Sequence, residues 1–205
     1  MNTENKIYIT RKLPQTAFDL LKRYFILEVY NKDRPIEKRE LKKVLYDKTG
    51  LISLLTDNID KEIMNSAPGL KIISNYAAGY NNIDIAEATK RGIMVTNTPD
   101  VLTETTADLT FGMIIGIARR IPEAERFLRK GRFRGWAPML FLGYDVHHKT
   151  IGIIGMGRIG RAVARRAMGF GMKILYYDKI RLSMKQEKIY SVHYKSIDYI
   201  LKNAD

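Results

Sequence analysis

The glycine-rich loop Gly155-Met156-Gly157-Arg158-Ile159-Gly160 has the spacing G-x-G-x-x-G, which in many proteins binds the pyrophosphate of a dinucleotide. In such a loop the first glycine permits a tight turn, the second lets the backbone approach the phosphates, and the third lets a helix pack closely on a strand. The N-terminus of that helix attracts the phosphates. The spacing therefore predicts a dinucleotide-binding site.

An acidic residue stands where such a site requires one. Asp178 follows Gly160 by 18 residues, close to the ~20 expected for the carboxylate that binds the ribose hydroxyls of adenosine. A carboxylate at this place accepts the 2′-hydroxyl of NAD and repels the 2′-phosphate of NADP, so NAD is the expected cofactor. Lys179 and Arg181 are cations that could accommodate a phosphate, and NADP therefore stays an alternative.

The elements predicted around the loop make the motif specific. A β-branched run at 150–154 precedes it, a helix is expected from Arg158 to about Met168, and a second strand from Lys173 to Tyr177 ends at Asp178. Strand, loop, helix, strand and acid in this order carry far more weight than the glycines alone. The alternative, in which Asp178 is only a turn residue at a strand end, is therefore less favoured.

A second candidate site is the small-residue segment 75–82, directly after a predicted strand. Open parallel sheets bind ligands beyond the carboxyl ends of their strands, and backbone N–H groups in such a loop approach anions closely. Ala78 and Gly79 could therefore hold a carboxylate. The alternative is a tight turn in which Gly79 is needed only for its backbone angles, and the residues alone favour the turn.

The first hundred residues alternate between short apolar runs and segments of helical periodicity, which is typical of an α/β fold with a parallel sheet. Strands are expected at Lys6 to Thr10, Phe25 to Val29, Leu51 to Leu55, Leu70 to Ser74 and Ile93 to Thr96. Pro14 stands where a helix could begin, and Asp60 and Asn82 are candidate N-caps.

The segment 97–100 predicts a hinge and a domain boundary, because Pro99 disfavours a helical conformation in the residue before it. From Leu102 to Arg120 we expect a helix, with acids near its start and arginines at its end. Its apolar positions occupy most of the circumference: Leu109, Phe111, Met113, Ile114, Ile115 and Ile117. Such a helix is either sandwiched inside one chain or packed against a partner subunit, and its periodicity favours neither.

The basic segment 119–134 and the aromatic residues after it resemble a platform for single-stranded nucleic acid, and the chain carries a net charge of +13. A charge run on a helix is, however, usually a solvated face, and no nucleic-acid recognition motif accompanies it. We therefore expect no nucleic-acid partner.

Composition excludes several other classes of function. The 205 residues contain no cysteine, so a disulfide scaffold, a thiolate metal site and a cysteine nucleophile are all excluded. No apolar run suits a signal peptide or a membrane helix, and a cytoplasmic protein is expected. His147 and His148 are adjacent, which points them apart on a strand, so no metal site is assigned.

Three segments in order resemble the D-isomer-specific 2-hydroxyacid dehydrogenases. They are 75–84, 96–103 and the glycine loop at 155–160. The segment Pro138-Met139-Leu140-Phe141-Leu142-Gly143-Tyr144 makes the glyoxylate/hydroxypyruvate reductases the closest group within that family. The resemblance runs from Lys6 to Asp205, and the combination of segments is specific.

This resemblance implies a flavodoxin-like, parallel-sheet substrate domain at 1–98, incomplete without a C-terminal part, and the first part of a Rossmann coenzyme domain at 99–205. It also implies that the helix 102–120 belongs to a dimer arm, so a homodimer is expected. By position, Ala78 and Gly79 would bind the substrate carboxylate, and Thr106 would lie near the nicotinamide end of the cofactor. The expected cofactor-binding residues are Thr106, Gly155, Gly157, Arg158, Ile159, Gly160, Asp178 and Lys179.

The chain departs from the family in its catalytic residues. The family's Arg, Glu and general-acid His match positions beyond Asp205, so we expect no catalytic residue here, only two strands of the coenzyme domain, and no turnover by these 205 residues. A separate C-terminal polypeptide is one conceivable partner. For the full enzyme the resemblance implies NAD(P)H-dependent reduction of glyoxylate or hydroxypyruvate to the D-2-hydroxy acid. The alternative is a non-catalytic dinucleotide-binding module or an inactive fragment.

Overall fold

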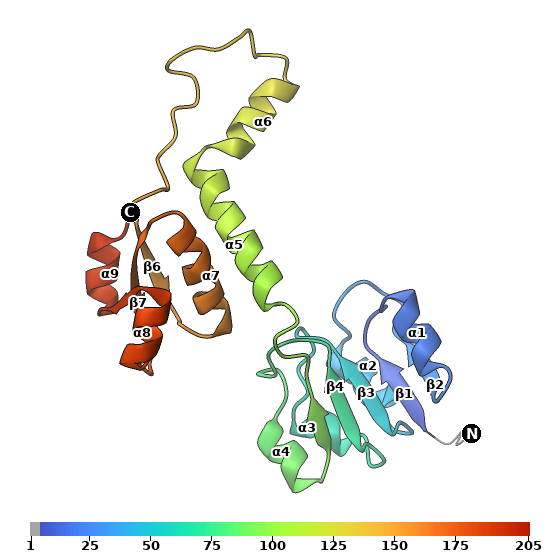
Figure 1. Ribbon diagram of the computed structural model, residues 1–205. Helices are drawn as coiled ribbons and strands as arrows, with labels where there is room; N and C mark the ends of the chain where they lie inside the picture. The colour runs from blue at the N-terminus through green and yellow to red at the C-terminus, as the bar shows by residue number, and fades with distance from the viewer. Residues whose placement is uncertain (1–4) are drawn as a thin grey trace. The chain divides into compact units, whose positions relative to one another are not determined.

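The computed structural model describes residues 5–205 and divides into two compact units, one up to Val101 and one from Leu102 to Asp205. The division lies slightly after the hinge expected at 98/99. Each unit has its own parallel sheet, as the ribbon drawing shows (Figure 1), and the buried side chains form a separate core in each unit. We describe the two units separately.

The first unit is a five-stranded parallel sheet with the flavodoxin-like strand order β2-β1-β3-β4-β5, which confirms the expected fold class. Ile9, Leu51 and Ile73, on the three inner strands, are at most 1% exposed. The elements are β1 (Lys6–Ile9), α1 (Gln15–Leu21), β2 (Ile26–Val29), α2 (Lys38–Val44), β3 (Gly50–Ser53), α3 (Lys61–Asn65), β4 (Ile72–Asn75), α4 (Ile85–Lys90) and β5 (Met94–Thr96).

Two of the helices in this unit begin at aspartates. The Asp60 side chain accepts hydrogen bonds from the backbone N–H groups of Glu62 and Ile63, as an N-cap should. The prediction for Asn82 is wrong, because α4 is capped by Asp84. The amide of Asn82 instead donates to backbone carbonyls beneath the loop that follows β4.

The second unit has three parallel strands in the order β6-β7-β8, which is the β-α-β-α-β arrangement of a nucleotide-binding half. The expectation of only two strands is wrong. The third is short, and Val192 is its one fully buried side chain, which left little apolar signal in the sequence. The elements are α5 (Thr103–Ala118), α6 (Ile121–Arg129), β6 (Thr150–Ile154), α7 (Arg158–Gly169), β7 (Lys173–Tyr177), α8 (Met184–Tyr190), β8 (Val192–Tyr194) and α9 (Ile197–Asn203).

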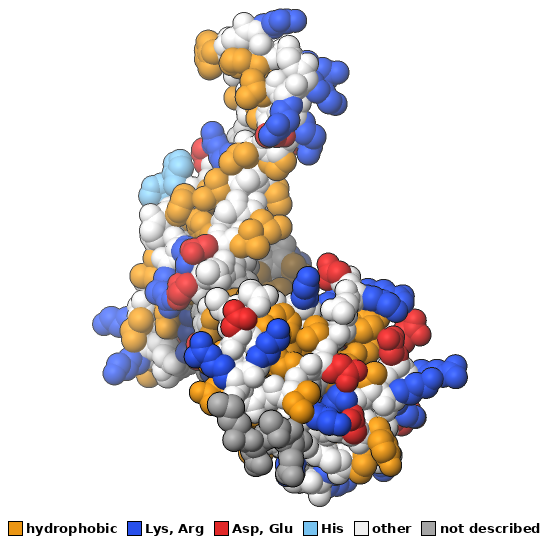
Figure 2. All heavy atoms as spheres, turned by 90° about the vertical axis from the view of Figure 1, so that its right-hand side faces the viewer, with side chains coloured by type: hydrophobic (Ala, Val, Ile, Leu, Met, Phe, Trp, Pro, Cys, Tyr) orange, Lys and Arg blue, Asp and Glu red, His pale blue; other side chains and the backbone are white. Residues whose placement is uncertain are grey.

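The helix α5 is buried on one side only. Ala107 and Phe111 pack into the same core as the alanines of α7. Leu109, Met113 and Ile117 are each more than half exposed, and hydrophobic side chains are visible along this surface in Figure 2. Within the part of the chain that the structure describes, the helix is therefore not sandwiched on all sides.

Further observations concern the adjacent histidines, metal ligands and membrane helices. His147 and His148 lie in a turn rather than a strand, and their rings meet edge-to-face at 5.2 Å between centroids, so the expectation that they point apart is wrong. Among residues 5–205, no group of three or more His, Asp or Glu side chains is placed to hold a metal ion. No helix in this range is long and apolar enough to cross a membrane.

Candidate binding sites for a dinucleotide and a carboxylate

The turn from β6 into α7 depends on two glycines of the fingerprint. Gly155 has a φ of +97°, a backbone conformation that side-chain-bearing residues rarely adopt, and its N–H donates to the Tyr177 carbonyl oxygen at 2.8 Å. A Cβ atom on Gly160 would lie 2.1 Å from the Gly155 carbonyl oxygen. The loop thus folds back directly onto the first turn of α7, and only glycine fits at Gly160.

Gly157 has a different environment from its neighbours. It is the N-cap of α7, it has no side chain that could accept hydrogen bonds from the first N–H groups of the helix, and a Cβ placed on it would meet no atom within 4 Å. Arg158 and Ile159 follow in the first turn and are exposed. First-turn N–H groups of a helix have no partner within the helix, so the space outside Gly157 is open to an anion.

Asp178 is tied to the same loop. Its Oδ2 accepts a hydrogen bond from the Met156 N–H at 2.6 Å, and its Oδ1 accepts one from the Ile180 N–H at 3.3 Å. The bond from Met156, followed by that from Ile180, holds the pKa of the Asp178 carboxyl below its ordinary value. A carboxylate has about four lone-pair directions, so the ionised group keeps capacity for ribose hydroxyls.

The two cations after Asp178 differ in their contacts. Lys179 is exposed, and its ammonium has no hydrogen-bond or ion-pair partner among residues 5–205. Arg181 forms a two-point ion pair with Glu187. The sequence suggested both cations as phosphate ligands, and it did not single out Glu187, which lies in the first turn of α8.

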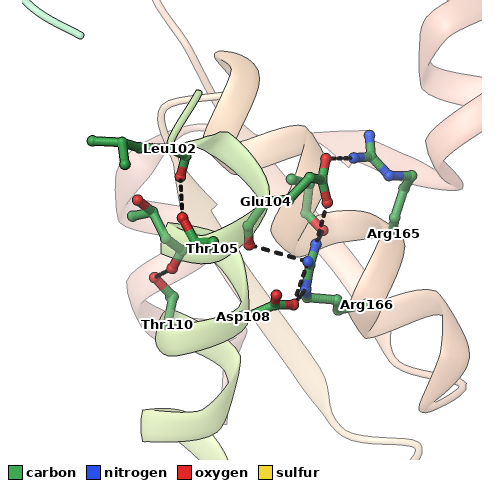
Figure 3. A network of polar contacts seen from close by, with 9 residues as sticks. Leu102, Glu104, Thr105, Asp108, Thr110, Arg165 and Arg166 are labelled. Atoms are coloured by element: carbon green, nitrogen blue, oxygen red, sulfur yellow. Dashed lines mark hydrogen bonds and ion pairs between the residues drawn. The ribbon is translucent and has the colours of Figure 1, made fainter. Parts of the chain in front are cut away.

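Thr106 lies in the first turns of α5, half-buried, and its carbonyl oxygen accepts the Thr110 hydroxyl at 2.8 Å. This end of α5 is docked on α7 by ion pairs shown in Figure 3. Arg166 donates to Glu104 at 3.1 Å and through Nε to Asp108 at 2.7 Å, and Arg165 pairs with Glu104 as well. The acids expected to stabilise the helix dipole thus also position Thr106 within the second unit.

The loop after β4 presents free backbone donors. The carbonyl oxygen of Ala78 accepts a hydrogen bond from Asn97 Nδ2, and that of Gly79 accepts one from Asn75 Nδ2, each at 2.8 Å. Both residues are exposed, and within residues 5–205 neither N–H donates to a protein acceptor. Gly79 does not have a positive φ, so a left-handed backbone conformation does not account for a glycine at this position. Two backbone N–H groups without a protein acceptor could bind a carboxylate.

A buried polar network supports this loop. Asn75 is fully buried; its Oδ1 accepts the Ser53 hydroxyl at 2.9 Å, and its Nδ2 also donates to Asn82 Oδ1 at 3.0 Å. Asn82 in turn donates to the carbonyl oxygens of Leu54 and Asp57. Sequence reasoning missed Asn75 and Asn97 as anchors, although the clustering of side-chain amides around the loop was a usable signal.

Comparison with known proteins places the chain in a family. The profile of the D-isomer specific 2-hydroxyacid dehydrogenase catalytic domain matches residues 7–197. A glyoxylate reductase of Korarchaeum cryptofilum is 48% identical over 201 residues, which cover 98% of this chain and 60% of that protein. A glyoxylate reductase of Thermococcus kodakarensis is 47% identical over 204 residues, with 98% and 61% coverage.

Solved structures also match this chain. The TT0316 protein of Thermus thermophilus matches with a TM-score of 0.89 and 40% identity, covering 98% of this chain and 62% of that one. The D-lactate dehydrogenase of Aquifex aeolicus, complexed with NAD and lactic acid, matches with a TM-score of 0.80 and 27% identity, covering 98% and 59%. The chain thus spans about three fifths of the length of its relatives. It belongs to the D-isomer-specific 2-hydroxyacid dehydrogenase family.

Proposed function

We propose that this chain binds NAD(H) at the 155–160 loop and the carboxylate of a small 2-keto acid at Ala78 and Gly79, as part of a reductase of glyoxylate or hydroxypyruvate. NAD is preferred over NADP because Asp178 is ionised and oriented beside the loop. The names of the two glyoxylate reductases support the choice of substrate class.

The observation that carries the proposal is the fit of the loop to a pyrophosphate. Gly160 leaves no room for a side chain, Gly157 leaves its outer side open, and Asp178 is bonded to the loop through Met156. When bound, the nicotinamide group supplies a hydride to the keto carbon. The residues of this chain hold the phosphates, the ribose and the substrate carboxylate, and so supply orientation.

Proton donation is not assigned to any residue of this chain. Its three histidines are His147, His148 and His193, and none matches the position of the family's general acid. We therefore expect the 205-residue polypeptide to bind NADH without reducing glyoxylate. Turnover near the enzyme median of ~10 per second by this polypeptide alone would contradict that expectation.

The binding test uses a small substitution at an open position. Gly157→Ala adds one methyl group where the structure has no atom within 4 Å, so folding should be preserved while the approach of the phosphates is blocked. Gly169→Ala, at the other end of α7 and equally open, is the matched control. We expect NADH fluorescence titration to show an affinity at least about tenfold lower in Gly157→Ala than in the wild type. The affinity of Gly169→Ala should equal that of the wild type. Equal affinities in both variants would contradict the proposed site.

A homodimer is the proposed assembly, because Leu109, Met113 and Ile117 form an exposed apolar row on α5. Sedimentation velocity of the chain and of Met113→Lys tests it. We expect the wild type to sediment as a dimer and the variant as a monomer; a monomeric wild type at micromolar concentration would contradict it.

A non-catalytic dinucleotide-binding module is the second candidate, because the glycine loop and Asp178 account for binding and orientation alone. Adding the C-terminal two fifths of a family enzyme as a fusion discriminates between the two. Restored reduction of glyoxylate supports the reductase, whereas NADH binding without turnover supports the module.

A further inference from the structure

Glu187, in the first turn of α8, holds the guanidinium of Arg181 at two points. Arg181 Nε donates to Glu187 Oε1 at 2.8 Å, and Nη2 donates to Oε2 at 3.0 Å. The guanidinium also lies over the Tyr194 ring, 5.3 Å from its centroid. This arrangement uses both the hydrogen-bonding fork of the arginine and one of its faces.

Glu187 is itself held in place. Tyr176, whose ring is fully buried, donates its hydroxyl to Glu187 Oε1 at 2.7 Å and accepts the Leu182 N–H at 3.0 Å. A capping box between Ser183 and Gln186 fixes the start of α8. Arg181 and then Tyr176 lower the pKa of Glu187 to about 2, so the group is ionised at neutral pH. Releasing Arg181 would leave this carboxylate without its charge partner.

The state of Arg181 matters because it lies three residues after Asp178, on the segment that leaves β7. A nucleotide phosphorylated on its 2′-oxygen brings a second charged group to that place, and arginine is the residue that binds phosphate at two points. Here the fork is already occupied by Glu187. Lys179 is left as an exposed ammonium near an acid that repels phosphate.

We propose that Glu187 is a specificity-determining residue: by keeping Arg181 paired, it favours a nucleotide with a free 2′-hydroxyl over one with a 2′-phosphate. This inference rests on the proposed binding of a dinucleotide at the 155–160 loop. Glu187 acts through Arg181 and Tyr176 and is thus a positioning residue, not a ligand of the nucleotide.

The test compares ADP-ribose with 2′-phospho-ADP-ribose by isothermal titration calorimetry on the 205-residue chain. Glu187→Gln keeps the size of the side chain and its hydrogen bond from Tyr176 while removing the charge that holds Arg181. We expect it to bind 2′-phospho-ADP-ribose about tenfold more tightly than the wild type does. Its affinity for ADP-ribose should stay within about twofold.

Three control variants test whether the gain in affinity for 2′-phospho-ADP-ribose depends on Arg181. Adding Arg181→Ala to Glu187→Gln should abolish the gain, and Arg181→Ala alone should leave both affinities within about twofold, because the arginine is already paired. Glu125→Gln, which removes the carboxylate paired with Arg129 on α6, should change neither affinity.

Several results would overturn the inference. They are an unchanged ratio of affinities in Glu187→Gln, a gain that persists without Arg181, and a weaker affinity for 2′-phospho-ADP-ribose in Arg181→Ala alone. Each of these leaves ADP-ribose binding intact and so spares the proposed function. Failure of the wild type to bind ADP-ribose would contradict the proposed function and this inference together.

Discussion

Both candidate binding loops leave backbone N–H groups available to a ligand, but one loop is shaped by side chains and the other by glycines. The loop after β4 is shaped by side chains, because Asn75 and Asn97 hold its carbonyl groups, while the N–H groups of Ala78 and Gly79 have no acceptor among residues 5–205. The loop after β6 is shaped by missing side chains, because Gly155 and Gly160 allow the backbone to fold onto α7. One loop is therefore vulnerable to the removal of polar groups, and the other to the addition of a methyl group.

The difference follows from where each loop finds its donors. The loop after β6 can use the N–H groups that begin α7, so it needs only to let a ligand approach the backbone closely. The loop after β4 is separated from the start of α4 by several residues, and its donors are positioned by the buried network of Ser53, Asn75 and Asn82. A buried polar group that loses its partner costs more free energy than an exposed one.

Gly160→Ala is expected to have the largest effect. Its methyl carbon would lie 2.1 Å from the Gly155 carbonyl oxygen, so the turn between β6 and α7 must open. We expect a loss of about 3 kcal/mol from the free energy of unfolding of the second unit. Hydrogen exchange resolved by mass spectrometry should show faster exchange in β6 and β7, with the first unit and the Gly157→Ala variant unchanged. Equal exchange in Gly160→Ala and Gly157→Ala would show that close packing is not what this glycine provides.

Asn75→Ala is expected to have the next largest effect, and on the other unit. It removes the partners of the Ser53 hydroxyl, the Asn82 amide and the Gly79 carbonyl, in one buried and two partly buried hydrogen bonds. We expect a loss of about 2 kcal/mol in the first unit, measured by urea unfolding and by faster exchange in β3 and β4.

Asn97→Ala is the matched control for Asn75→Ala. It removes a single, more exposed bond to the Ala78 carbonyl, so the expected loss is only about 0.5 kcal/mol. If the two variants lose the same stability, the loop does not depend on the buried network.

These contrasts also explain what could be predicted from the sequence. The bounds of β6, α7 and β7 follow from local information, because the glycines and the apolar runs lie within one short stretch. The network below the loop after β4 does not, because Asn82 donates to Leu54 and Asp57, which lie 28 and 25 residues away. The sequence pattern predicts an N-cap at Asn82, whereas the amide of this residue belongs to the network below the loop.

The same reasoning applies to the strand β8 and to Arg181. Three residues with one buried side chain carry no clear strand period, and β8 is defined by its pairing with β7. Lys179 and Arg181 were equivalent as charges in the sequence, and only the folded position of Glu187 distinguishes them. Pairing between elements, through the backbone in β8 and through side chains at Arg181, is thus the information that the local pattern lacks.

Acid pH should remove the stabilisation that ionised Glu187 gives to the second unit. The ion pair with Arg181, with help from Tyr176, lowers its pKa from the ordinary 4.5 to about 2. A lowered pKa in the folded state stabilises the protein above the unfolded pKa, and this stabilisation is lost as the pH falls from about 4.5 through about 2. The difference in melting temperature between the wild type and Glu187→Gln should therefore be constant above about pH 5 and shrink toward pH 2.

Asp47 provides the counterpart in the first unit. Lys48 and Lys6 lower the pKa of its carboxyl to about 2. The difference in melting temperature between the wild type and Asp47→Asn should therefore also shrink toward pH 2, with the change confined to the first unit. Hydrogen exchange at pH 3 and pH 6 assigns each change to its unit. A difference that stays constant down to pH 2 in either variant would show that the ion pair does not stabilise the fold.

Gly79→Ala is expected to have the smallest effect on stability, although it changes a glycine in a candidate binding loop. Its Cβ would contact only Leu55 Cδ1 at 4.0 Å, and the residue has no positive φ, so the change should stay within about 0.5 kcal/mol. Gly155→Ala, at a φ of +97°, is the comparison and should cost about 1–2 kcal/mol by urea unfolding. If the two glycines prove equally sensitive, backbone conformation shapes both loops and the contrast between them fails. If only Gly155 is sensitive, the fold does not require a glycine at position 79, and the small size of Gly79 is then available for the close approach of a ligand.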